Sequence, residues 1–159
     1  MFDRELKTFR FLLGYGQMLL SDVEDAEMTA QPLPGMNHPA WILGHLCIAF
    51  DRHGEHVGAE RQLTEWDAQF GMGTRPKPGR DAYMGKDNLL AAFLGSGERF
   101  AAAVAAAPAE VLETPTEGPL AEPFPTNGDF LAFSLTSHTS IHLGQLSAWR
   151  KATGRPALF

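Results

Sequence analysis

Hydrophobic residues recur at steps of three or four positions along much of the chain. In one stretch they are Phe2, Leu6, Phe9, Leu13, Leu20 and Val23, and in the next they are Trp41, Ile42, Leu46, Ala49 and Phe50. Such steps follow the 3.6-residue period of an α-helix and gather the apolar side chains on one face. With an Ala- and Leu-rich third stretch and a fourth bounded by helix signals, the pattern predicts four helices, over residues 3–25, 37–58, 87–107 and 127–153.

Residues that start or stop helices support these boundaries. Asn37 is expected to cap the second helix, and Pro39 suits a first turn because it has no amide hydrogen to leave unbonded. The third helix stops at Pro108, and Gly154 and Pro156 end the fourth. Because no stretch alternates between apolar and polar residues for long enough to indicate a strand, the sequence predicts an all-α fold.

Two connections between the predicted helices are unusually long. Residues 60–86 hold a short segment, 64–69, that is expected to form one turn of helix. Residues 109–126 are expected to be an extended crossover because they contain Pro115, Pro119, Pro123 and Pro125. Connections longer than about 12–15 residues usually carry function or cover a site. We therefore expect one domain, residues 1–159, folded as a four-helix bundle with long crossover connections.

Composition narrows the classes of partner and compartment. The 159 residues carry a net charge of −6, which disfavours a nucleic-acid partner because such proteins need a basic surface. The acidic N-terminus, with Asp3 and Glu5, does not resemble a signal peptide, and no uninterrupted apolar run approaches the roughly 20 residues of a membrane helix. The lone Cys47 fits a reducing compartment. We expect a cytoplasmic protein without a membrane or nucleic-acid partner.

Histidine spacing is the most informative chemical signal in the sequence. His138 and His142 lie four residues apart in the fourth predicted helix, about 40° around and 6 Å along its axis, so both imidazoles leave one face. His45, on the inward face of the second helix, is the best-placed third ligand. Three imidazoles leave coordination positions open, as in catalytic zinc sites, and imidazole also suits nickel, iron and copper. Spacing alone leaves the alternative open that these are hydrogen-bonded core or surface histidines.

Other polar residues allow two interpretations each. His53 and His56 could form a second metal site, but we favour a structural role as cations near a helix C-terminus. His38 is a loop or cap residue outside the ligand set. Gln145 either hydrogen-bonds a ligand imidazole or bound water, or satisfies helix packing, and the same two interpretations hold for Ser134, Ser137 and Thr139.

Two further features each have a structural and a functional explanation. Cys47 is expected to be inert packing rather than a nucleophile, because small buried thiols in helices usually are. One connection gathers four basic residues that either attract an anionic thiol cofactor or, as we favour, belong to a solvated loop: Arg75, Lys77, Arg80 and Lys86.

Two stretches resemble a known family. Residues 37–46, with Trp41 followed by Gly-His-Leu, resemble the second-helix signature of the DinB-like (DinB/YfiT) superfamily, and residues 138–146 resemble its His-x3-His-x-Gly-Gln signature. The resemblance implies an up-down-down-up four-helix bundle, frequent homodimers, and a divalent metal site formed by His45, His138 and His142. Some members use low-molecular-weight thiols such as bacillithiol, mycothiol or glutathione in S-transfer or isomerisation.

These features together predict a function built on one divalent metal ion, zinc or nickel ahead of iron or manganese. An open imidazole-bound ion lowers the pKa of a bound thiol or water. The first hypothesis is a thiol-dependent S-transferase or isomerase that acts on a small molecule and uses a low-molecular-weight thiol as co-substrate. The alternatives are a metal-dependent hydrolase and a non-catalytic metal- or ligand-binding bundle in stress response. An enzyme should have an open pocket lined partly by the two long connections.

Overall fold

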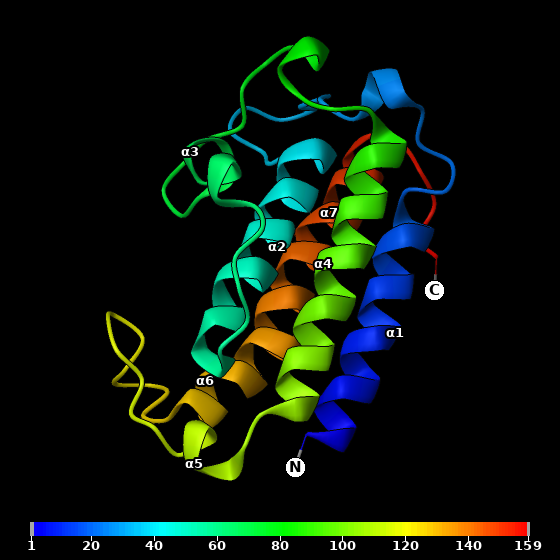
Figure 1. The fold of residues 1–159 in the computed structure, drawn as a ribbon. Coiled ribbons are helices and arrows are strands. Elements are labelled where there is room, and N and C mark those ends of the chain that lie inside the picture. The colour runs from blue at the N-terminus through cyan, green and yellow to red at the C-terminus, as the bar shows by residue number, and fades with distance from the viewer. Residues whose placement is uncertain (1, 159) are drawn as a thin grey trace.

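The computed structural model describes residues 2–158, and all helices in this range belong to one all-α fold (Figure 1). The long helices are α1 (Asp3–Leu19), α2 (Pro39–His53), α4 (Lys86–Ala106) and a last segment made of α6 (Asn127–Phe133), a π-helical turn (Ser134–His138) and α7 (Thr139–Ala152). Short helices are α3 (Asp67–Phe70), α5 (Ala109–Leu112) and four 3₁₀ turns, Asp25–Glu27, Gly54–Val57, Thr64–Trp66 and Arg80–Ala82. The predicted all-α class is confirmed.

The four long segments lie side by side, and each packs against two neighbours. α2 contacts α4 and α7, and α1 contacts the same two helices from the other side (Figure 1). The predicted apolar stripes face the space between the segments. Three phenylalanine rings lie at the centre of this space. Phe9 contacts Phe50 and Phe100 edge-on at centroid distances of 5.0 and 5.7 Å, and Phe50 stacks on Phe100 at 5.9 Å. Burial of this apolar surface is the main force that holds the helices together.

The first helix ends earlier than its apolar pattern predicts. Residues 3–25 were expected to be helical, but α1 stops at Leu19, whose carbonyl accepts a hydrogen bond of 2.7 Å from the buried guanidinium of Arg150. The same guanidinium pairs with Asp22. Val23 is nevertheless buried, so its apolar character reflects packing of the following turn and not a continued helix.

The start of α2 also differs from the prediction. His38 caps the helix, because its Nδ1 accepts the Trp41 amide hydrogen at 3.2 Å, and the expected cap Asn37 donates its side-chain amide to Gln145 instead. Pro39 occupies the first turn as predicted.

The long connections contain short helices. Residues 64–69 are helical as expected, because the 3₁₀ turn Thr64–Trp66 continues directly as α3. This helix packs on α2 where Gly44 leaves room for the ring of Phe70. The connection 109–126 is not wholly extended, because its first residues form α5. Its later part is closed by an isolated antiparallel bridge between Pro115 and Thr126.

One segment, Arg80–Ala106, is long and apolar enough to cross a membrane by length and composition alone. This segment contains α4. Packing in the core also explains the apolar character of α4, because several of its residues are buried there: Leu89, Phe93, Phe100, Ala101 and Val104.

Candidate metal centre

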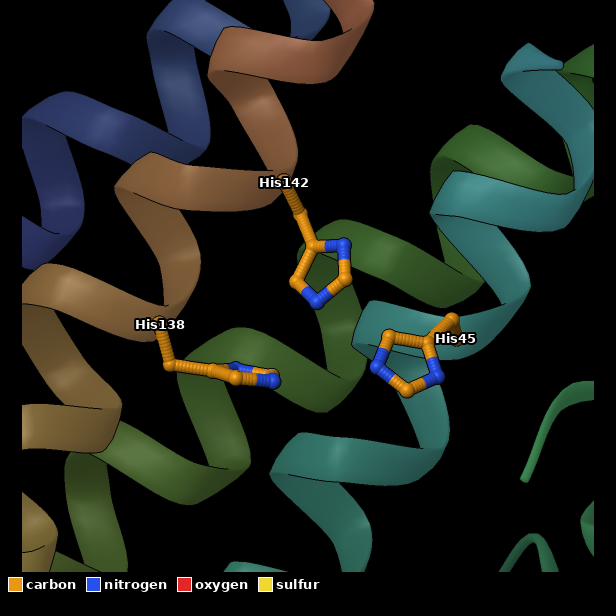
Figure 2. A group of neighbouring side chains, drawn as sticks. All are labelled: His45, His138 and His142. Carbon is orange, nitrogen blue, oxygen red and sulfur yellow. The ribbon is translucent and has the colours of Figure 1, made fainter. Parts of the chain in front are cut away.

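Three histidines from two sides of the helical core meet at one point. His45 extends from the middle of α2, His138 is the last residue of the π-helical turn, and His142 lies in the first half of α7 (Figure 2). One ring nitrogen of each lies within 4.8 Å of the others. The ring of His142 is centred 4.5 Å from that of His45 and 4.7 Å from that of His138. All three residues singled out in the sequence are thus brought together.

The backbone of the connection 60–86 fixes the orientation of His45. Its Nδ1–H donates to the carbonyl oxygen of Phe70 at 2.8 Å, so Nε2 carries the free lone pair. The ring also stacks on Trp41 at a centroid distance of 4.8 Å, and the Trp41 indole donates to Thr74 Oγ1. A histidine that donates its second nitrogen to a carbonyl is the usual arrangement of a metal ligand.

Burial keeps the three imidazoles neutral. Loss of hydration lowers the pKa of His45, lowers that of His138 to about 4 and lowers that of His142 to about 3. The neighbouring imidazoles add to the effect at His138 and His142. The buried Nδ1 atoms of His138 and His142 have no hydrogen-bond partner among residues 2–158. Three neutral nitrogen donors within reach of one another fit a divalent zinc, nickel or iron ion.

A cavity of about 830 Å³ opens beside the three histidines, a volume suited to a small organic molecule. Both long connections contribute to it, as expected for an enzyme: Met72 and Gly73 come from one, and Thr116, Glu117, Pro119 and Leu120 from the other. Much of the remaining wall is apolar and aromatic, from Trp41, Ile48, Ala49, Phe130 and Phe133. The sequence predicted that the two connections line the cavity but not which of their residues do so, because these segments come together only in the fold.

His53 and His56 also line this cavity but lie outside the three-histidine cluster. His53 Nδ1 is hydrogen-bonded to Ser134 Oγ at 2.6 Å, and burial lowers its pKa well below the usual value. The expectation that His53 acts as a cation at the helix end is therefore wrong. His56 Nδ1 donates to Asn127 Oδ1 at 3.0 Å, which ties the end of α2 to the start of α6.

His38 and Gln145 have protein partners. His38 is fully buried, and because its Nδ1 accepts the Trp41 amide hydrogen, its Nε2–H donates to the carbonyl of Lys77 at 3.2 Å. Gln145 Oε1 accepts the Asn37 amide at 2.9 Å, and its side chain also interacts with His142, where it raises the pKa of that imidazole, so its position fits both interpretations.

The basic residues of the connection 60–86 do not line the cavity, although Met72 and Gly73 of the same connection do. Arg80 pairs with Asp25, and Lys86 Nζ donates to the carbonyl of Val23. Neither Arg75 nor Lys77 lines the cavity within the part of the chain described here. Cys47 is fully buried, and burial raises its pKa to about 12, so it is inert as expected.

Comparison with known proteins agrees with this geometry. The sequence model of the DinB superfamily matches residues 16–146, a range that includes the three histidines and both signature stretches. No curated protein matches the chain. Since the match covers most of the sequence, the chain belongs to the DinB superfamily.

Proposed function

We propose that the protein is a metal-dependent enzyme that binds one divalent ion through His45, His138 and His142. The observation that carries this proposal is the cluster of three neutral imidazoles, with ligand nitrogens within 4.8 Å of one another, in the wall of an 830 Å³ cavity. Nitrogen donors suit zinc and nickel first, with iron and manganese as alternatives.

The reaction that we propose is S-transfer or isomerisation with a low-molecular-weight thiol. A divalent ion in such a site would lower the pKa of a bound thiol or water. The chain's own residues would orient and shield the reactants: the Phe70 carbonyl fixes the ring of His45, and the apolar wall excludes water from the reacting thiolate and an apolar electrophilic substrate. Neutral imidazoles and an inert Cys47 leave the attacking sulfur to the co-substrate.

Two alternatives use the same geometry. A hydrolase would direct water instead of a thiol to the substrate, and a non-catalytic binding bundle would hold a ligand without turnover. Thiol consumption with a panel of electrophiles supports the transferase, ester or amide cleavage without thiol supports the hydrolase, and binding without either product supports the bundle.

We also propose that the fold is the up-down-down-up four-helix bundle implied by the resemblance, in a cytoplasmic homodimer. The support for the topology is that α1 and α7 run in one direction in Figure 1 while α2 and α4 run in the other. The support for the dimer, beyond the resemblance, is apolar surface on α1, where the exposed fractions of Phe11 and Met18 are 60% and 48%.

The first experiment is elemental analysis of protein purified without a histidine tag. We expect near-stoichiometric zinc, nickel, iron or manganese, and its loss in His142→Ala. The matched control is His56→Ala, which removes a cavity-lining histidine outside the cluster and should keep the metal. Absence of metal in the wild type, even after incubation with each ion, would refute the proposal.

A further inference from the structure

The last helical segment is interrupted beside the candidate metal centre. Between α6 and α7, residues Ser134–His138 form a π-helical turn, which was not predicted, and His138 is its final residue. Such turns are rare, and they are frequently found at functional sites. An uninterrupted α-helix would satisfy its own backbone without help, so the interruption calls for an explanation in the residues around it.

The π turn changes which face of the segment carries His138. Successive residues of an α-helix are about 100° apart, so His138 would lie about 80° around the axis from Phe130 in a regular helix. A π turn accommodates one extra residue, and this reduces the angle to about 20°. Phe130 and His138 in fact line the same cavity, and the His53 ring is centred 4.8 Å from Phe130 and 5.5 Å from His138. The turn therefore lets α6 keep its core contacts while His138 faces His45.

Side chains hold this turn from two directions. Ser134 Oγ, at its start, is hydrogen-bonded to His53 Nδ1 of α2 at 2.6 Å. Thr139 Oγ1, directly after its end, donates to the carbonyl oxygen of Ser134 at 2.9 Å, five residues back. Ser134 and Thr139 are fully buried, so water does not compete for either bond.

We propose that Ser134, Thr139 and His53 are positioning residues that hold the π turn and thereby set the direction from which His138 enters the metal site. This inference rests on the proposed function, because it concerns the geometry of the same three ligands. None of the three residues belongs to the three-histidine cluster; they would act through the backbone of residues 134–138.

The test measures cobalt(II) and zinc(II) binding by the purified protein and the absorption spectrum of the cobalt form, which reports ligand geometry. Ser134→Ala removes the bond to His53, and Thr139→Val removes the bond to the Ser134 carbonyl with little change of shape. We expect each to weaken binding roughly 10- to 100-fold, as loss of groups that orient ligands does, and to change the cobalt spectrum. Thr139→Ser keeps the hydroxyl and should restore both.

Two further variants separate positioning from stability. Ser96→Ala is the matched control, because Ser96 is also a buried helical serine whose hydroxyl bonds a local carbonyl, that of Phe93, but it lies in α4. It should leave affinity and spectrum unchanged. If Ser134→Ala does not fold, as judged by circular dichroism, His53→Asn and His53→Ala replace it: asparagine retains a polar atom near the position of Nδ1, so only alanine should alter the spectrum.

The results distinguish two failures. Wild-type affinity and spectrum in Thr139→Val and in the folded Ser134 or His53 variants would overturn the positioning role and leave the metal site intact. A wild-type protein that binds neither cobalt nor zinc would overturn the proposed function, and the positioning role with it. An equal effect of Ser96→Ala would reduce the role to general stability and overturn the inference as well.

Discussion

Substitution of Gly44 by alanine should damage the metal site through a residue that is not a ligand. A Cβ at this position would lie 2.5 Å from Cζ of Phe70 and closer still to two other atoms of that ring. The ring would have to move, and the carbonyl of the same residue accepts the hydrogen bond that orients His45. A single methyl group on α2 would therefore disturb the ligand in the adjacent position.

The size of the effect follows from two opposing terms. Overpacking of a filled core costs about 1–3 kcal/mol, whereas alanine is favoured over glycine within a helix by about 1 kcal/mol. We expect a net loss of about 1 kcal/mol in the free energy of unfolding of the metal-free protein. Metal affinity should fall roughly 10-fold or more, because the group that orients a ligand is displaced.

Gly144→Ala is the matched control for this experiment. Gly144 also lies in a helix beside the site, two residues after His142, but apart from its chain neighbours and the backbone of its own helix, nothing lies within 4 Å of the position of its added Cβ. This variant should gain about 0.5–1 kcal/mol and keep its metal affinity. Urea unfolding and competition for zinc with a chelator measure both quantities. Unchanged stability and affinity in Gly44→Ala would show that Phe70 moves without effect on His45, and would refute the reasoning.

Three further predictions concern charge and assembly. In the unfolded chain His138 and His142 take up protons near pH 6.5, whereas in the folded, metal-free protein their pKa values are about 4 and 3. The metal-free protein should therefore lose stability as pH falls from 6.5 to 5, and a free energy of unfolding that stays constant across this range would contradict this prediction. Arg150→Met should cost about 1–3 kcal/mol in thermal or urea unfolding, because it leaves the Leu19 carbonyl unpaired and Asp22 with only the longer contact to Arg155; an unaltered midpoint would show that the Arg150 contacts add nothing. Sedimentation should show a dimer, and a single species near 17.4 kDa at high concentration would exclude it.

The parts of the fold that the sequence predicts well are those governed by local periodicity. The four long helices and the pairing of His138 with His142 follow from residues close together in the chain. The early end of α1 could not be predicted in this way, because the group that binds the Leu19 carbonyl is Arg150, from the opposite end of the chain. The lowered pKa of His53 likewise comes from burial against residues such as Phe130, whose ring is centred 4.8 Å away although it is distant in the chain.

The π turn marks a different limit of sequence analysis. Its residues include Ser134, Thr136 and Ser137, which are neutral in helix propensity and give no periodic signal of an extra residue. One signal was available: Phe130 and His138 must both face α2, but a regular helix would place them about 80° apart around its axis.

The division of the cavity between helices and connections has a consequence for how such a protein changes over evolutionary time. The three histidines lie on long helical segments, where packing in the core restricts substitution. Residues such as Met72 and Leu120 lie in loops, where insertions and replacements are tolerated. Substrate selectivity can therefore change while the three histidines are retained. Loops 60–86 and 109–126 grafted from another chain of the superfamily should transfer its substrate preference and leave the inherited metal affinity in place.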